Sequence, residues 1–280
     1  MKFRIFILAF SVGFVFCFTA AVLFVFSFSG TKTEEPETED FSEAVFLEET
    51  KAVFLLVYES ENGFGPFTLI NFDAEAGRIP VFTFSGRAAI NYGGNYVSAG
   101  DLFSSVSPGI FAGTVEKNFG IELSGYFIWN RESAEKIISK AGTFDYVLPE
   151  NISYSLGNKT VNLSSGIQNM TGKKICDIFV SPKFSEGERC DAVSRITAAF
   201  INRRLRRLLP ESSLYSVIFN YTETDVNAFD KEKYSKIIEV LSSSGKSLSG
   251  HITNDTERDI STGLLYFSDS TSDRIARYFK

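Results

Sequence analysis

Residues Ala52 to Ser60 read AVFLLVYES, a short and almost uninterrupted apolar run of strand length. Such a run is typical of a β-strand that is buried on both faces. Further along, the apolar segments Phe67–Phe72 and Ile79–Phe84 flank the turn-forming sequence DAEAG at Asp73–Gly77. Two apolar runs around a short loop that contains glycine predict a β-hairpin. We therefore expect three strands of a central sheet within residues 52–84.

Strands and helices alternate along the rest of the chain. The sequence predicts strands at Gly125–Trp129, Phe144–Leu148 and Tyr215–Phe219, and near Leu264–Phe267. It predicts helices within Ala99–Phe119, around Gly166–Cys176, at Ala192–Leu209 and at Asp230–Ser242, and a loop at Ser85–Asn95. The first of these helices should be split at Pro108 and Gly109. A further helix is predicted at Arg131–Ala141, with Asn130 before its start and Gly142 after its end. This order indicates an α/β or mixed α+β domain whose central β-sheet is flanked by helices.

A long uncharged segment precedes this domain. About 25 residues, Ile5–Ser29, pass without a charge, and a helix needs roughly 20 apolar residues to cross a membrane. Lys2 and Arg4 precede the segment and the acidic stretch Glu34–Asp40 follows it, which places the amino terminus in the cytoplasm. The alternative is a cleaved signal peptide, whose apolar region of about 7–15 residues would be shorter and would end in small residues.

This pattern predicts a single-pass protein of the cell membrane. Its parts are a cytoplasmic start (residues 1–4), a transmembrane signal anchor (5–29), an acidic extracytoplasmic linker (30–50) and an extracytoplasmic domain (51–280).

Composition narrows the possible chemistry. The formal net charge of −6 is mild and gives no indication of a nucleic-acid-binding surface. His251 is the only histidine, which argues against histidine-based catalysis and against a multi-histidine metal site. Cys176 and Cys190 are the cysteines of the predicted outward domain. They can form a disulfide in an oxidising exterior or remain two buried free thiols, and both alternatives stay open.

Three segments follow one another in a recognisable order. The predicted hairpin Asn71–Phe84 comes first, and Gly120–Tyr154 follows with the sequence GIELSGYFIWNRESAEKIISKAGTFDYVLPENISY. The third segment, Val161–Phe179, reads VNLSSGIQNMTGKKICDIF and is similar to a Leu-x-x-Gly-x-Gln-x-Leu-x-Gly pattern. Together with the closing segment ETDVNAFDKEKYSKIIEVL at Glu223–Leu241, they resemble the LytR–CpsA–Psr (LCP) family of bacterial cell-envelope proteins, over about residues 50–280. The order of anchor, spacer and outward domain resembles that family as well.

This resemblance implies a fold and an activity. The fold is a mixed sheet whose flanking helices enclose an apolar channel for a polyprenyl chain. The activity is the transfer of a glycopolymer from polyprenyl pyrophosphate to peptidoglycan, in which Mg²⁺ assists, arginines hold the pyrophosphate and aspartates assist the metal or the attacking hydroxyl. The implied partners are the membrane, a polyprenyl (pyro)phosphate lipid and a cell-wall glycan.

Most positions that carry this chemistry in the family are replaced here. The family's Asp-Thr pair falls at or next to Gly65–Pro66, which cannot bind a metal, so Mg²⁺ is not firmly implied. Arg87 keeps an arginine, but Ala88 stands where the family has a carboxylate. In a later arginine motif Arg195 matches, whereas Arg189 stands at an aspartate position. Because loss of one such group typically lowers a rate about a hundredfold or more, we expect the transferase chemistry to be lost.

Three hypotheses about function follow. The favoured one is a catalytically degenerate LCP-like protein, a pseudoenzyme that binds a polyprenyl-linked or wall glycan or an envelope partner. Its phosphate-binding candidates are Arg87, Arg195 and Arg189. The second is an active phosphotransferase whose site is rebuilt from carboxylates such as Asp101, Glu188 or Asp191. The third is a structural envelope scaffold with a filled core. No catalytic residue is assigned from the sequence.

Overall fold

The computed structural model of this chain describes residues 50–61, 63–156, 159–208, 213–243 and 248–280. The predicted membrane anchor, residues 5–29, and the predicted linker up to residue 49 lie outside this range. Within these described ranges, every helix is too short or too polar to span a membrane.

A mixed six-stranded sheet forms the centre of the domain, with the strand order β11-β6-β1-β2-β3-β12. Its strands are β1 (Lys51–Ser60), β2 (Gly63–Asp73), β3 (Ile79–Phe84), β6 (Gly125–Trp129), β11 (Glu223–Thr224) and β12 (Ser249–Ile252). β1, β2 and β3 are antiparallel neighbours, whereas β6 runs parallel to β1 and β12 parallel to β3. The predicted hairpin and the central mixed sheet are confirmed.

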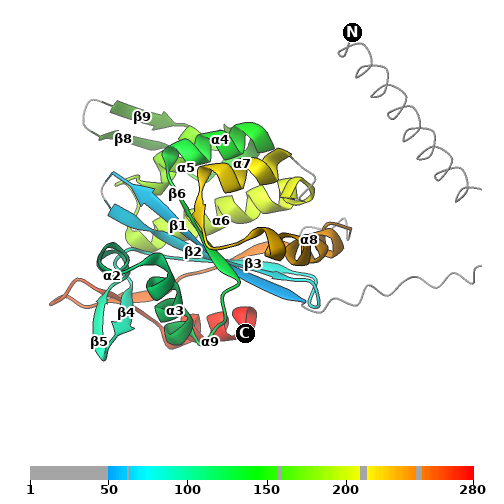
Figure 1. Cartoon of the computed structure of the whole chain (residues 1–280). Coiled ribbons are helices and arrows are strands. Elements are labelled where there is room, and N and C mark those ends of the chain that lie inside the picture. Colours follow the sequence, from blue (N-terminus) through cyan, green and yellow to red (C-terminus); the bar gives the residue numbers. More distant parts are fainter. Residues whose placement is uncertain (1–49, 62, 157–158, 209–212, 244–247) are drawn as a thin grey trace, which may run out of the picture. The chain divides into compact units, whose positions relative to one another are not determined.

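Helices cover both faces of this sheet (Figure 1). One face carries α2 (Ala99–Ser105), α3 (Pro108–Phe119) and α9 (Asp269–Phe279). The other carries α4 (Arg131–Ala141), α5 (Gly172–Phe179), α6 (Glu186–Arg204), the 3-10 turn η1 (Leu205–Leu208), α7 (Ser213–Tyr221) and α8 (Ala228–Ser243). Val53 and Leu55 pack into the first core, and Ala52 and Phe54 into the second, because successive side chains of a strand point to opposite faces. This double burial explains why β1 is apolar almost throughout.

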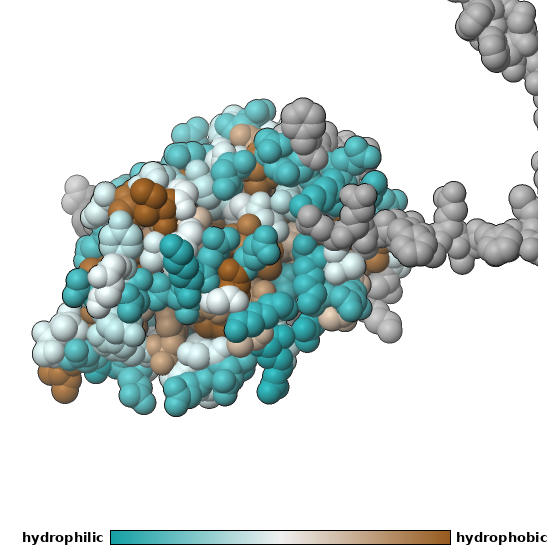
Figure 2. Space-filling model, turned by 60° about the horizontal axis from the view of Figure 1, so that its bottom comes forward, coloured by the Kyte–Doolittle hydropathy of each residue, from teal (hydrophilic) through white to brown (hydrophobic). Residues whose placement is uncertain are grey.

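Four small ribbons complete the domain. They pair β4 (Ala89–Tyr92) with β5 (Asn95–Ser98), β7 (Phe144–Leu148) with β10 (Gly166–Met170), β8 (Ile152–Leu156) with β9 (Lys159–Leu163), and β13 (Thr256–Arg258) with β14 (Leu265–Phe267). Figure 2 shows that one face of the molecule is mainly hydrophilic and carries separate apolar patches, as expected for a domain that buries most of its large apolar side chains.

Predicted helix boundaries are confirmed where capping residues mark them. The Asn130 side chain accepts a hydrogen bond from the Ser133 N–H at the start of α4, and Gly142 ends this helix at a positive φ of 85°. Pro108 begins α3 after a break from α2, as predicted from its rigid ring. Such local signals are reliable because both partners of the interaction lie within a few residues.

Three predicted elements are wrong. Tyr215–Phe219, predicted as a strand from its aromatic and β-branched residues, lies in α7, where tertiary packing outweighs this local preference. Ser85–Asn95, predicted as a loop, contains β4, because Gly93 and Gly94 both take positive φ and close a two-residue hairpin. The predicted helix Gly166–Cys176 begins only at Gly172, since Gly166–Met170 forms β10.

Cys176 and Cys190 are buried free thiols in the structure, which is the second of the two alternatives left open by the sequence. Burial raises the pKa of Cys176 to about 11 and that of Cys190 to about 12. Since the thiolate is the reactive form, both side chains should be inert near neutral pH.

We therefore expect iodoacetamide at pH 8 to alkylate these two cysteines at least about a hundredfold more slowly in the folded protein than in urea. Mass spectrometry of the peptides that carry Cys176 and Cys190 measures both rates. If neither cysteine is alkylated in urea until a reductant is added, the two form a disulfide and the free-thiol assignment is wrong.

Candidate functional site

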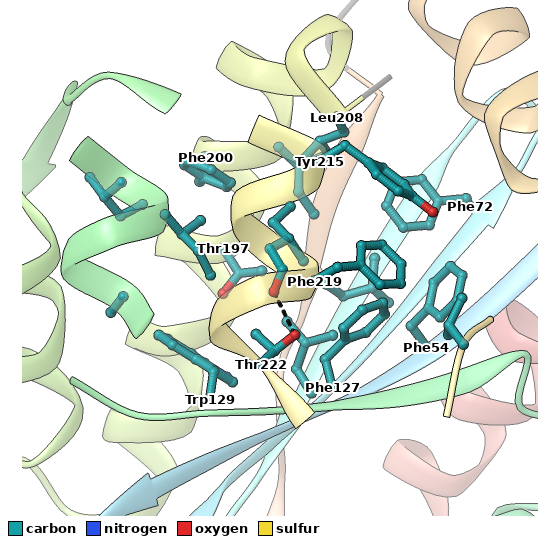
Figure 3. A pocket seen from close by; sticks show the side chains of 18 of the residues that line it. Phe54, Phe72, Phe127, Trp129, Thr197, Phe200, Leu208, Tyr215, Phe219 and Thr222 are labelled. Carbon is teal, nitrogen blue, oxygen red and sulfur yellow. Dashed lines mark hydrogen bonds between the residues drawn. The ribbon is translucent and has the colours of Figure 1, made fainter. Parts of the chain in front are cut away.

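An apolar cavity of about 230 Å³ lies between the central sheet and helices α4 to α8 (Figure 3). Its lining residues include Phe54, Phe72, Phe127, Trp129, Phe200, Leu208, Tyr215 and Phe219. One of its few polar side chains is already satisfied, since the Thr222 hydroxyl, just after α7, donates to the Ile218 carbonyl at 2.7 Å. The surface of this cavity is therefore suited to a hydrocarbon.

A polar pocket of about 710 Å³ lies between the loops and helix ends that surround one end of strands β1, β2 and β3. It is lined by residues of the β1–β2 turn, the β3–β4 loop, the first turns of α2 and α6, and the β13–β14 loop. The Gly100 N–H donates to the Gly86 carbonyl at 2.8 Å, and a Cβ on Gly86 would lie only 2.7 Å from the Phe64 carbonyl oxygen. Glycine at position 86 thus permits the close approach that places Arg87 and Asp101 at this pocket.

Two arginines and two carboxylates line the polar pocket. Glu186 accepts a hydrogen bond from the Ser85 hydroxyl at 2.5 Å, and its other oxygen lies 3.7 Å from Nη1 of Arg189. Arg189 also donates from Nη2 to the Phe184 carbonyl at 3.3 Å, so its guanidinium is held in place. Asp101 accepts from the Ser98 hydroxyl at 2.5 Å.

Arg87 is the exposed cation of this pocket. Its backbone N–H donates to the Ser85 hydroxyl at 3.0 Å, and its carbonyl accepts from the Leu265 N–H at 3.0 Å, so the backbone is fixed on both sides. Within the described part of the chain, its guanidinium forms neither an ion pair nor a side-chain hydrogen bond. A phosphate could therefore bind Arg87 without displacing a protein partner.

The apolar cavity and the polar pocket share one lining residue, Phe179. This ring packs edge-to-face against Tyr58 and Trp129, with centroid distances of 5.5 and 5.6 Å. Phe179 is buried, with 3% of its surface exposed, and thus stands between a hydrocarbon environment and one with arginines.

The structure brings some of the sequence-predicted residues together and excludes others. Arg87, Arg189 and Asp101 all line the polar pocket. Arg195 does not, since its Nε donates to Nε2 of His251 at 3.2 Å beside β12. Burial and the neighbouring Arg195 lower the pKa of His251.

The two other proposed carboxylates have structural roles. Glu188 forms a capping box with Ser185 at the start of α6, and hydrogen bonds from Ser185 lower its pKa. Asp191 accepts from the backbone N–H of Asn254 at 3.1 Å. Neither is among the described residues that line the polar pocket.

Glu186 and Ser85 are two residues of this pocket that the sequence analysis did not select. The predicted helix began at Ala192, whereas α6 begins at Glu186. The sequence does contain a signal for this start, because Ser185-x-x-Glu188 matches the capping-box pattern. It would have placed Glu186 and Arg189 one turn apart on the same helix face.

The described carboxylates do not form an all-protein site for the magnesium ion that the LCP resemblance implies. Within the described ranges of residues 50–280, the His, Cys, Asp and Glu side chains form no cluster of three or more that could hold a metal ion. Asp101 and Glu186 already accept hydrogen bonds from Ser98 and Ser85. Mg²⁺ is usually held by one or two carboxylates together with waters and substrate phosphates, so Asp101 and Glu186 would hold it only together with a bound phosphate.

No protein-family model matches the sequence, and neither does any curated protein. Several solved structures are similar. One is a protein from Eubacterium siraeum described as a candidate transcription regulator, with a TM-score of 0.72 and 16% identity, over 88% of this chain and 98% of that one. Another is Bacillus subtilis TagV, with a TM-score of 0.65 and 13% identity, over 83% of this chain and 96% of TagV.

A third similar structure is TagT bound to LIIa-WTA, with a TM-score of 0.63 and 12% identity, over 82% of this chain and 90% of TagT. TagV and TagT are LCP-family proteins. At these identities the likeness concerns the fold alone: the domain has an LCP-like mixed α+β fold.

Proposed function

We propose that this protein binds a lipid-linked glycan of the cell envelope. The polyprenyl chain would occupy the apolar cavity, and the phosphate or pyrophosphate would lie in the polar pocket against Arg87 and Arg189. The observation that carries this proposal is the position of Phe179, which lines both spaces. The LCP-like fold adds support, since TagT of similar fold is known bound to a wall teichoic acid ligand.

In this function the protein binds its ligand but does not catalyse the transferase reaction. Ala88 and Gly65–Pro66 replace the carboxylate and the Asp-Thr pair of the family, and the pocket carboxylates are engaged by serine hydroxyls. Arg189 is likewise partly neutralised by Glu186. Binding of an anion needs only the exposed charge of Arg87 and a held guanidinium, whereas transfer needs further groups that stabilise a transition state.

The location of the protein is part of the proposal. The apolar segment 5–29 would anchor the chain in the cell membrane, with residues 51–280 outside. In this arrangement a polyprenyl lipid of the same membrane is within reach of the domain through a linker of about 20 residues.

Arg87→Ala tests the polar half of the site. We expect this change to weaken binding of undecaprenyl pyrophosphate about 10- to 100-fold, because a charge-assisted contact to phosphate is lost. The purified full-length protein in nanodiscs is titrated with the lipid, with and without magnesium. Arg195→Ala is the matched control, since Arg195 is equally an exposed arginine but binds His251 instead of lining the pocket.

The outcomes separate the three hypotheses. Saturable binding that ignores magnesium and falls in Arg87→Ala, but not in Arg195→Ala, supports the proposal. No saturable binding contradicts it and favours a structural scaffold. Magnesium-dependent binding favours the second candidate, an active phosphotransferase, for which the presence of Asp101 and Glu186 in the same pocket is the relevant observation.

A further inference from the structure

An exposed tyrosine and a half-buried tyrosine pack against each other near the polar pocket. Tyr96 on β5 and Tyr266 on β14 lie edge-to-face, with ring centroids 5.3 Å apart and an angle of 65° between the rings. Tyr96 keeps 54% of its surface exposed, although Tyr266 holds its ring in place. An aromatic ring that is ordered before binding contributes contact area at a low cost in conformational entropy.

The position of the pair follows from strand alternation. On β5, Val97 packs against the core, so Tyr96 and Ser98 share the opposite face, and Ser98 lines the polar pocket. On β14, Leu265 and Phe267 face the core, so Tyr266 points away from it. Tyr96 and Ser98 are two strand residues apart, about 7 Å. The aromatic pair therefore continues the wall of the pocket outward.

Hydrogen-bonding side chains accompany this pair. Asn91 is the cross-strand partner of Tyr96, and Glu257 is the cross-strand partner of Tyr266. Both side chains are exposed. Directly opposed side chains in a ribbon lie within about 4.5–5.5 Å at Cβ, so an amide and a carboxylate flank the two rings.

We infer that Tyr96 and Tyr266 form a stacking platform for the sugar that follows the phosphate of the ligand; this inference rests on the proposed function of the pocket. A pyranose ring presents C–H bonds on its faces, which pack against an aromatic ring, and hydroxyl groups at its edge, which Glu257 and Asn91 can bind. A hydrocarbon chain could use the rings but would desolvate the flanking amide and carboxylate without compensation. On this basis the glycan lies at the rim of the polar pocket, and the lipid chain lies in the apolar cavity.

Binding of two lipids that differ only in the sugar tests this assignment. The probes are undecaprenyl pyrophosphate and undecaprenyl-pyrophosphoryl-N-acetylglucosamine, titrated into the full-length protein in nanodiscs. Tyr96→Ala should weaken binding of the sugar-bearing lipid about three- to tenfold and leave the sugarless lipid unchanged. Tyr96→Phe should retain binding of both, since the ring remains.

Tyr92→Ala is the matched control. Tyr92 is an exposed tyrosine of the same ribbon, but it lies on the opposite face, which it shares with the buried Ile90. The Tyr92→Ala variant should bind both lipids with unchanged affinity. If Tyr96→Ala behaves as Tyr92→Ala does, or if it weakens both lipids equally, the platform is wrong.

A soluble sugar separates this inference from the proposed function. Saturation-transfer NMR with tri-N-acetylchitotriose reports contact of the sugar with the protein without any lipid. If undecaprenyl pyrophosphate does not bind, the proposed function fails, whereas sugar signals that Tyr96→Ala removes and Tyr92→Ala keeps would retain the platform. If neither assay gives a sugar contact that depends on Tyr96, the platform is overturned.

Discussion

Replacing Gly172 with alanine is expected to destabilise the domain by about 3 kcal/mol or more. Gly172 begins α5, where this helix crosses α4. An added Cβ would lie 2.5 Å from the Cα of Glu135 and 2.6 Å from the Ala134 carbonyl oxygen. These contacts are with backbone atoms inside a helix, so the strain cannot be relieved by rotating a side chain. The two helices must move apart, which disturbs the core between them.

Gly113→Ala is the matched control for this prediction. Gly113 also lies in a helix, α3, but its added Cβ would meet only a Glu116 side-chain oxygen at 3.8 Å. Alanine there should be neutral or stabilise the domain by up to about 1 kcal/mol, since it is the better helix former. Urea denaturation followed by circular dichroism gives both free energies of unfolding. Equal stability of the two variants would show that the close crossing of α4 and α5 is not required.

Phe219→Asp is expected to reduce binding of undecaprenyl pyrophosphate at least about a hundredfold. Phe219 lies on α7 and lines the apolar cavity, where it packs edge-to-face on Phe127 at 5.7 Å and stacks on Tyr215 at 4.5 Å. A carboxylate at this position would lose its hydration when a hydrocarbon chain enters, and the described residues that line the cavity offer it no positively charged partner.

Ser216→Asp controls for the added charge. Ser216 lies on the same helix but is exposed, and it is not among the described residues that line the cavity. This variant should bind the lipid as the unchanged protein does. Circular dichroism shows whether both variants are folded before the lipid titration is compared. If Phe219→Asp is folded and still binds with undiminished affinity, the hydrocarbon chain does not occupy this cavity.

The two predictions concern neighbouring parts of one face of the sheet. α4 and α5 hold Ala134 and Ile175 against the apolar cavity, so the tight crossing at Gly172 also fixes one wall of the proposed lipid site. A mild change at the crossing could therefore weaken lipid binding without contact with the lipid. Comparison of the loss of lipid binding with the loss of unfolding free energy in each variant distinguishes this indirect effect, because Gly172 is not among the described residues that line the cavity, whereas Phe219 is.

Much of the fold follows from local patterns in the sequence. The apolar run of β1 requires burial on both faces, and Asn130 and Gly142 fix the ends of α4 through contacts within a few residues. The order of such segments was enough to indicate the LCP-like fold that the similar structures share. Two of the three arginines proposed from the sequence, Arg87 and Arg189, line the same pocket, and their binding of a phosphate stays a prediction.

Only the tertiary structure decided which other groups belong to the site. Ser85 and Glu186 are 101 positions apart and meet in a hydrogen bond, whereas Arg195 turns to His251 although it shares α6 with Arg189. The segment Tyr215–Phe219 has a strand-like composition, yet it is helical and closes the apolar cavity. Local propensity spans about 1 kcal/mol, and long-range packing of several aromatic side chains exceeds it. The sequence by itself determined the layers of this protein, and the packing of distant segments determined its cavity, its pocket and the charges between them.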